Sequence, residues 1–178
     1  VTFLFTIQVP GLKNIKVLIM SYANMKPMNA NVHQYIANWV KKGGVLIYCG
    51  KDDDPYQHVM EWWDTKENHY TAPSQHLFKL LGINTADDNA HGYKVGKGKV
   101  YVIRQDPKEF VLNTNGDKDF VQTVKHAYES DAKGGALQFK NNFYLERGPY
   151  DIISVMDENE DSCSYKIKGE LITLFDPM

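Results

Sequence analysis

The sequence predicts an α/β protein with a three-layer, open and mostly parallel sheet, helices on both faces of the sheet, and a C-terminal β appendage. Two observations lead to this prediction. Residues 15–50 contain an apolar run, an amphipathic stripe and a second apolar run, the pattern of a strand–helix–strand unit. After the glycine pair at 134–135 the helical pattern stops and short strand-like runs follow. We therefore expect an α/β domain over residues 1–135 and a β-rich segment over residues 136–178, which would begin a following β domain.

The strand–helix–strand unit consists of three segments. Residues 15–21 are apolar and branched, as in strands that are covered on both faces. Apolar side chains recur with helical spacing over residues 32–40, and the glycine pair that follows would end this helix. Residues 45–48 form the second buried strand. A helix that connects two parallel strands in this way is expected to make a right-handed crossover.

Three more helices are predicted downstream. Asp54 and Pro55 suit the cap and the first turn of a helix over residues 55–63. A Pro-Ser pair opens a helix over residues 73–81, which a glycine closes, and residues 120–128 carry apolar side chains at helical spacing. We expect these helices to cover the faces of the sheet.

Short strands are predicted in the remaining segments. Residues 93–95 and 99–104 flank a Gly-Lys-Gly sequence and are expected to form a β-hairpin. Four further strand-like runs follow the glycine pair: 137–139, 143–145, 152–156 and 165–174. Short strands with open edges usually need a partner, and the sequence leaves open whether this tail folds by itself.

Composition and charge limit the classes of function. The 178 residues, 43% of them apolar, suffice for one domain with a single core. Lys plus Arg (20) nearly balances Asp plus Glu (22), so no nucleic-acid partner is expected, because such partners require a basic face. No run approaches the roughly 20 apolar residues that span a bilayer, so no membrane association is expected either.

The chain begins with Val1, and its apolar first residues lack the basic flank of a signal peptide. We therefore expect a processed chain or a piece of a longer protein. It would be soluble, and located in the cytoplasm, or in the periplasm or outside the cell if a signal lies upstream.

Candidate ligand-binding residues gather at the carboxyl ends of the first two predicted strands, where open α/β sheets bind ligands. They are Ser21, Tyr22, Asn24, Asp52, Asp53 and Asp54. Clustered carboxylates can bind sugar hydroxyls or a hard cation, but a cap and a solvated loop explain the three aspartates as well. Adjacent aspartates point in different directions and make a poor pair for glycoside hydrolysis. Since no second set of ligands accompanies the His-Glu pairs on the helices, we expect no metal and no cofactor.

Cys49 is the candidate nucleophile, because it stands where a strand ends and a loop begins. A reactive thiolate needs a base or a helix N-terminus to lower its pKa. Three aspartates precede the nearest predicted helix and would oppose thiolate formation. The simpler interpretation is a small buried apolar side chain.

Aromatic side chains and one arginine complete the candidates. Tyr56, Trp62 and Trp63 could stack on a sugar ring, although adjacent tryptophans also divide between a core and an interface. Arg147 begins an Arg-Gly-Pro-Tyr turn, where it could pair with a carboxylate of a ligand or, as a structural contact, of the protein.

Residues 16–50 resemble the class I glutamine amidotransferase-like, flavodoxin-like fold in their order of strand, loop, helix, Gly-Gly, strand and Cys. More closely, three motifs are similar to the non-catalytic amidotransferase-like domain of large bacterial glycoside-active enzymes. The motifs are Ser-Tyr-Ala-Asn-Met-Lys-Pro at 21–27, Trp-Val-Lys-Lys-Gly-Gly-Val-Leu-Ile at 39–47 and Arg-Gly-Pro-Tyr-Asp-Ile at 147–152. The β-galactosidase trimerisation domain and the middle domain of galacto-N-biose-type phosphorylases are of this design. There a catalytic barrel precedes the domain and a β-sandwich follows it.

The chain also departs from working amidotransferases, which carry Gly-x-Cys-x-Gly and a later His-x-Glu. Here Cys49 lies in Tyr-Cys-Gly-Lys, and no His-x-Glu occurs. The resemblance therefore implies a non-catalytic scaffold, oligomerisation or active-site-shaping domain of a bacterial carbohydrate-active protein, whose parent would be a glycoside hydrolase or phosphorylase. Its partners would be other domains of its own chain, a second copy in a homo-oligomer, or carbohydrate. Two alternatives stay open: a small hydrolase or amidotransferase that uses Cys49, and a sugar-binding module.

Overall fold

The computed structural model of the chain divides into two compact units, Val1–Leu137 and Gln138–Met178. The residues whose structure is described are 9–23, 25–57, 59–85, 92–139, 142–155 and 169. Within them, no helix is both long and apolar enough to cross a membrane.

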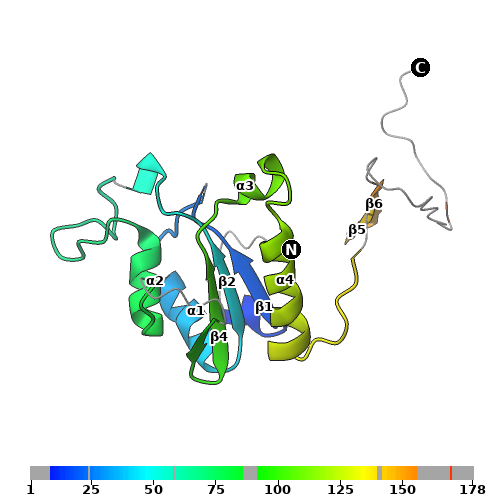
Figure 1. The fold of residues 1–178 in the computed structure, drawn as a ribbon, viewed down its shortest axis with the longest axis horizontal. Coiled ribbons are helices and arrows are strands. Elements are labelled where there is room, and N and C mark those ends of the chain that lie inside the picture. The colour runs from blue at the N-terminus through cyan, green and yellow to red at the C-terminus, as the bar shows by residue number, and fades with distance from the viewer. Residues whose placement is uncertain are drawn as a thin grey trace, which may run out of the picture. The chain divides into compact units, whose positions relative to one another are not determined.

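The first unit combines helices with a four-stranded sheet (Figure 1). In chain order its elements are the 3-10 turn η1 (Val9–Leu12), β1 (Val17–Met20), α1 (Asn31–Lys41), β2 (Val45–Cys49), the 3-10 turn η2 (Pro55–Gln57), α2 (Pro73–Leu81), β3 (Tyr93–Val95), β4 (Gly98–Ile103), α3 (Pro107–Leu112), α4 (Lys118–His126) and the π-helical turn η3 (Ala127–Asp131). The strand order is β1-β2-β4-β3; β1, β2 and β4 are parallel, and β3 is antiparallel to β4. The prediction of an α/β fold with a mostly parallel sheet is confirmed.

Strand β2 lies in the middle of the sheet and all five of its residues are buried. Successive side chains of a strand point to opposite faces. Leu46 and Tyr48 join the apolar cluster that includes α1 and α2 residues, whereas Ile47 and Cys49 join the cluster that includes Val124 of α4. Helices therefore contact both faces of the central strand, which explains its uninterrupted apolar sequence.

Helix α1 ends where the sequence predicts, at the glycine pair. Gly43 has a positive φ of 124°, and the Gly44 N–H donates a hydrogen bond to the Trp39 carbonyl oxygen at 3.1 Å. A Cβ atom on Gly44 would lie 2.3 Å from the Trp39 ring. The indole N–H in turn donates to the Ile15 carbonyl oxygen at 3.2 Å. Only glycine fits at 44, because the Trp39 ring lies over that position.

The predicted hairpin over residues 93–104 is confirmed, and it also belongs to the main sheet. While β3 pairs with one edge of β4, the other edge pairs in parallel with β2, in the register Ile47↔Tyr101. The carboxyl end of β4 therefore lies at the same edge of the sheet as those of β1 and β2.

Two local predictions are wrong. The predicted helix over residues 55–63 is only the 3-10 turn η2. Met60 is 91% exposed and Trp63 only 2% exposed, although the two would lie on adjacent positions of one helical face. The Trp63 indole N–H donates to the Gln57 carbonyl oxygen at 2.8 Å, which turns the chain back into the core. Conversely, α3 forms where the sequence predicts only a break, since the Glu109 side chain accepts a hydrogen bond from the Asp106 N–H at 2.8 Å and so closes its first turn.

The second unit contains an antiparallel hairpin of β5 (Asn142–Arg147) and β6 (Tyr150–Val155). It confirms the predicted strand over 143–145 and, as far as the described residues reach, the one over 152–156. The run 137–139 is not a strand, and the Leu137 N–H donates to the Glu129 side chain at 3.0 Å instead. The predicted strand over 165–174 lies outside the described residues.

Candidate functional site

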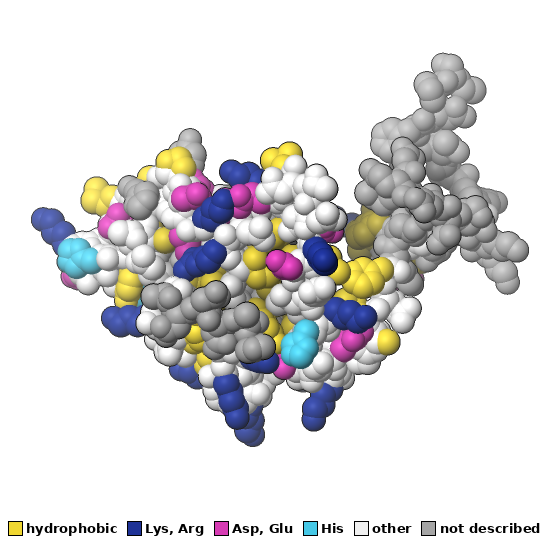
Figure 2. Space-filling view, in the orientation of Figure 1, with side chains coloured by type: hydrophobic (Ala, Val, Ile, Leu, Met, Phe, Trp, Pro, Cys, Tyr) yellow, Lys and Arg dark blue, Asp and Glu magenta, His cyan; other side chains and the backbone are white. Residues whose placement is uncertain are grey.

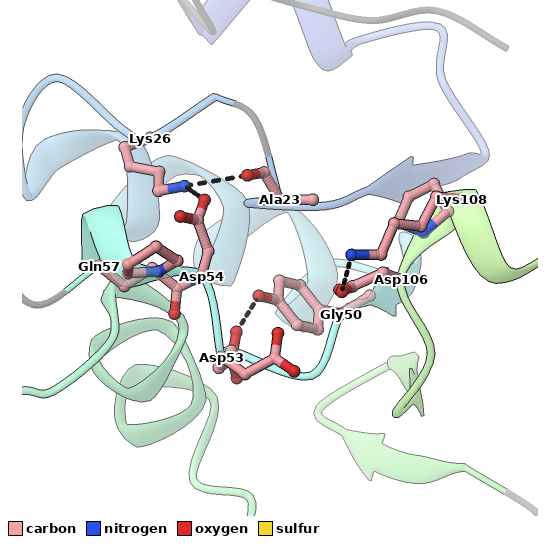
Figure 3. Close-up of a pocket in the computed structure, with 12 residues that line it drawn as sticks. Ala23, Lys26, Gly50, Asp53, Asp54, Gln57, Asp106 and Lys108 are labelled. Atoms are coloured by element: carbon pink, nitrogen blue, oxygen red, sulfur yellow. Dashed lines mark hydrogen bonds and ion pairs between the residues drawn. The ribbon is translucent and has the colours of Figure 1, made fainter.

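A cavity of about 740 Å³ lies at the carboxyl ends of the three parallel strands (Figure 3). Ala23 follows β1, Gly50 and residues 52–54 follow β2, and residues 106–108 follow β4; all of them line the cavity. Open α/β sheets bind ligands at this edge, because the strands end there and only loops enclose the space beyond them. The visible face of the first unit carries Lys, Arg, Asp and Glu side chains interspersed (Figure 2).

Asp52 connects three elements at this edge. Its backbone has a positive φ of 62°. One carboxylate oxygen accepts a hydrogen bond from the Tyr48 hydroxyl at 2.5 Å, and the other accepts from the Ser74 hydroxyl at 2.7 Å and from Arg104 Nη1 at 2.6 Å. Burial, followed by the nearby Asp52 charge, raises the pKa of Tyr48. The Asp52 carboxylate thus accepts hydrogen bonds from residues at the end of β2, at the start of α2 and in the loop after β4.

Lys26 and Asp54 form an ion pair that joins the loops after β1 and β2. The Lys26 ammonium also donates to the Ala23 carbonyl oxygen at 3.1 Å. Both charged side chains are largely covered, with 15% and 19% of their surface exposed. A partly buried ion pair of this kind holds its loops more firmly than an exposed one.

Asp106 and its neighbours hold the third loop. The Lys51 N–H donates to Asp106 Oδ1 at 3.2 Å, and the Lys108 ammonium lies 4.0 Å from Asp106 Oδ2. The Lys51 side chain pairs with Glu109. Their hydrogen bond raises the pKa of Lys51 and lowers the pKa of Glu109. The loops after all three strands are therefore connected by internal ion pairs.

Two residues that line the cavity, Gln57 and Asp53, belong to none of these ion pairs. Gln57 is only 2% exposed, and its Oε1 is the one buried side-chain polar atom of the described residues that has no hydrogen-bond partner. Asp53 is exposed and belongs to none of the ion pairs found among the described side chains. Both residues line the cavity.

Cys49 does not line the cavity. It is the last residue of β2, 2% exposed, and lies in the apolar cluster with Ile47 and Tyr101. Burial raises the pKa of its thiol to about 12. Two buried or half-buried histidines, His33 and His76, are associated with the opposite face, where α1 and α2 lie. No hydrogen bond links the Cys49 sulfur to a histidine in the part of the chain that the structure describes.

The two histidines form a buried hydrogen-bonded row with Tyr22. The Tyr22 hydroxyl lies 2.7 Å from His33 Nε2, and His33 Nδ1 lies 2.9 Å from His76 Nδ1. Burial, with a smaller contribution from His76, lowers the pKa of His33 to about 3, and burial also lowers the pKa of His76. A neutral imidazole has one N–H, so both bonds of His33 run in the same direction along the row. The Trp62 ring packs edge-on against both imidazoles.

The structure brings only some of the predicted site residues together. Asp52, Asp53 and Asp54 share the cavity wall, whereas Ser21 and Tyr22 do not line it. The Ser21 hydroxyl accepts a hydrogen bond from the Ala23 N–H at 3.1 Å, and Tyr22 is buried.

The remaining predicted residues lie elsewhere or outside the description. Trp63 is buried in the core, and the Trp62 indole N–H donates to the Pro27 carbonyl oxygen at 2.8 Å; neither ring lines the cavity. Arg147 belongs to the second unit, at the end of β5, opposite Tyr150. Asn24 and the side chain of Tyr56 lie outside the described residues.

Sequence reasoning missed five residues that bring polar side chains to the cavity wall. They are Lys26, Tyr48, Gln57, Asp106 and Lys108. Asp106 could have been found, because it follows β4, but this requires knowing that β4 pairs in parallel with β2. His33 had a signal as well: it lies on the buried stripe of α1 with Ile36, Ala37 and Val40. Gln57 had no such signal. It is buried because residues 55–57 form a 3-10 turn, whereas the sequence predicts a helix there.

The cavity wall therefore carries charged and hydrogen-bonding side chains, whereas Cys49, the candidate nucleophile, is buried outside it. Among the described residues no cluster of three or more His, Cys, Asp or Glu side chains could hold a metal ion. Comparisons with protein-family models, with curated proteins and with solved structures give no match for this chain.

Proposed function

We propose that this chain is a non-catalytic scaffold domain of a bacterial carbohydrate-active protein, which packs against other domains or a second copy and shapes a neighbouring active site. The observation that supports the non-catalytic part of the proposal is the environment of the Cys49 thiol. A cysteine nucleophile requires access to substrate and a base that lowers its pKa. Cys49 has the opposite environment, because it is buried among apolar side chains that raise its pKa to about 12.

The backbone at Cys49 supports the same conclusion. The nucleophile of an α/β hydrolase sits on a strained turn between a strand and a helix, which exposes its side chain. Cys49 is instead the last residue of β2, in regular parallel register with Ile103 of β4. The first positive φ beyond it is at Gly50, whose N–H donates to the Ile103 carbonyl oxygen at 3.0 Å. Regular pairing thus continues past the thiol.

The proposal includes a finer architecture: a three-layer open sheet with helices on both faces, followed by a C-terminal β appendage. Two apolar clusters support the layers. One contains α1 and α2 residues with Leu46 and Tyr48, and the other contains α4 residues with Ile47 and Cys49.

The packing part of the proposal is supported by the hairpin of the second unit. Directly opposed residues share a face of a hairpin. One face of β5 and β6 carries Phe143, Leu145, Tyr150 and Ile152, all of them between 39% and 69% exposed. A two-stranded hairpin is marginal by itself in water. We expect this apolar face to be covered by a further domain of the parent protein.

Thiol labelling tests the non-catalytic assignment. The variant Cys163→Ser leaves Cys49 as the single thiol, and Cys49→Ser serves as the matched control. A pKa near 12 in place of 9.0 leaves about 1000-fold less thiolate at pH 8, so iodoacetamide should label native Cys163→Ser far more slowly than the same variant in urea. Rapid native labelling, or glutamine hydrolysis that Cys49→Ser abolishes, would instead identify the chain as the Cys-dependent enzyme.

A further inference from the structure

We propose that a second cavity, at the amino ends of strands β1 and β2, binds a small organic anion: a carboxylate, sulfate or phosphate group carried on a flat ring. This cavity has a volume of about 830 Å³, which lies within the usual range for small-molecule sites. The proposal goes beyond the scaffold function and does not depend on it, because Cys49 and the loops at the carboxyl edge take no part in this cavity.

Three segments of the first unit form the walls of the second cavity. They are residues 12–16 before β1, residues 35–44 of α1 and the turn into β2, and residues 131–133 after η3. The Trp39 indole N–H donates a hydrogen bond to the Ile15 carbonyl oxygen at 3.2 Å, and the Lys16 ammonium donates to the Lys133 carbonyl oxygen at 3.4 Å. Hydrogen bonds therefore hold the three walls together.

Four lysines give the second cavity a positive charge. All of them are exposed, and they take part in no ion pair among the described side chains: Lys13, Lys16, Lys42 and Lys133. The Asp131 carboxylate lies on the same wall, but it accepts hydrogen bonds from the Lys99 ammonium at 3.2 Å and from the Tyr101 hydroxyl. Since the whole chain carries a net charge of −2, this local positive charge is not a general property of its surface.

The end of helix α1 explains only one of these lysines. The C-terminus of a helix attracts cations, which suits Lys42, the residue that caps α1. Lys13, Lys16 and Lys133 belong to other segments. Lys133 also has a φ of 50°, in the left-handed region, so this lysine stands where the backbone itself favours glycine. Like charges that gather at one cavity repel each other, and an anion bound between them would remove this repulsion.

Aromatic side chains of α1 line the same cavity. Tyr35 and Trp39 are four residues apart and therefore lie on one side of the helix. The Tyr35 side chain is 41% exposed and that of Trp39 is half-buried. Leu12, Ile15 and Ala132 extend the apolar surface beside them. Flat rings pack well on such a surface, whether they are aromatic bases or the C–H face of a sugar.

The ligand class follows from the combination of lysines and rings. An inorganic anion would use the lysines and leave the aromatic surface uncovered, and a neutral ring would do the reverse. A cation would be repelled. An anionic group on a flat ring satisfies both parts of the wall, because ammonium groups form strong hydrogen bonds to carboxylate, sulfate or phosphate oxygens. A nucleotide and an acidic sugar both have this chemistry.

Isothermal titration calorimetry of the full chain tests the ligand class with matched probes. ADP is compared with adenosine and with pyrophosphate, and digalacturonate is compared with neutral galactobiose. We expect saturable binding of ADP or digalacturonate, at least tenfold tighter than binding of its neutral counterpart, and tighter binding of ADP than of pyrophosphate if ADP is the ligand bound. The tighter of the two anions identifies the source of the ligand. If neither anion binds saturably, or if a neutral counterpart binds as tightly, the inference is wrong.

Two variants test whether the anion binds in this cavity. Lys13→Gln/Lys133→Gln removes charges from two walls and should weaken binding at least tenfold, and Tyr35→Ser removes an exposed ring and should weaken it severalfold. Lys66→Gln/Lys118→Gln is the matched control, because it changes the net charge equally at two exposed lysines outside the cavity, and should leave binding unchanged. Equal losses in the two double variants would show that overall charge attracts the anion, and unchanged affinity in Lys13→Gln/Lys133→Gln would refute the site.

Discussion

His33 Nδ1 lies 2.9 Å from His76 Nδ1, so two imidazoles join helix α1 to helix α2. At most one of the two can be protonated while this hydrogen bond holds, because a protonated imidazole has no acceptor nitrogen. Burial lowers the pKa of both residues, that of His33 to about 3.

The histidine pair makes the fold sensitive to acid. A histidine whose pKa is lower in the folded than in the unfolded state contributes stability that is complete above the unfolded value of 6.5 and falls as the pH drops toward 3. We expect His33 to reduce the free energy of unfolding by about 2 kcal/mol between pH 6.5 and pH 5. Urea denaturation at several pH values measures this, with His33→Gln expected to flatten the curve and exposed His69→Gln to leave its slope unchanged. An equal acid response in wild type and His33→Gln would contradict the prediction.

Asp52 should be sensitive to both its charge and its backbone conformation. Asp52→Asn keeps a side chain that tolerates a positive φ but loses the charge that Arg104 binds, and should cost about 1–2 kcal/mol. Asp52→Ala also loses the acceptors for Tyr48 and Ser74 and should cost about 3 kcal/mol. The free energy of unfolding in urea decides this, with exposed Asp53→Asn as the control, expected to change it by less than about 0.5 kcal/mol. If alanine were no worse than asparagine at 52, the hydrogen bonds would not be holding the loop.

Gly44→Ala should destabilise the chain strongly. The new methyl group would lie 2.3 Å from the Trp39 ring, and displacing that ring breaks its hydrogen bond to Ile15. We expect a loss of about 2–4 kcal/mol, from overpacking and the broken hydrogen bond. Gly11→Ala is the matched control, since a methyl group added there would meet no atom within 4 Å beyond its chain neighbours. Thermal unfolding followed by circular dichroism compares the two, and similar melting temperatures would refute the account.

Cys49 should tolerate loss of its sulfur better than a change to a hydroxyl. Cys49→Ala leaves a small cavity and should cost about 1 kcal/mol, whereas Cys49→Ser places an unpaired hydroxyl among Ile47 and Tyr101 and should cost about 2 kcal/mol or more. Denaturant titration ranks the two variants. The reverse order would show that the thiol site is polar and accessible, contrary to its burial.

Local sequence patterns were sufficient to predict the strands and helices whose buried side chains recur at a regular spacing. The run in β2, the stripe of α1 and the closing glycines specify their own conformation, because side-chain period and backbone freedom act within a few residues. The same reasoning failed at residues 55–63, where Asp54 and Pro55 resemble a helix start. There the Trp63 indole N–H donates a hydrogen bond to the Gln57 carbonyl oxygen, and this contact competes with helix formation.

The candidate site likewise combines features that the sequence predicts with features that only tertiary contacts decide. That Asp52, Asp53 and Asp54 follow a buried strand is visible in the chain itself, and their place at the carboxyl edge follows from the strand direction. Which protein groups bind Asp52 and Asp54 depended on Arg104, Ser74 and Lys26, which belong to α2 and to the loops after β1 and β4. Asp106 and Gln57 joined the cavity wall only through the parallel pairing of β4 with β2 and the packing of Trp63. Residues far apart in the chain meet only once the sheet has formed, so such contacts leave no periodic signal in the sequence, whereas helix and strand patterns do.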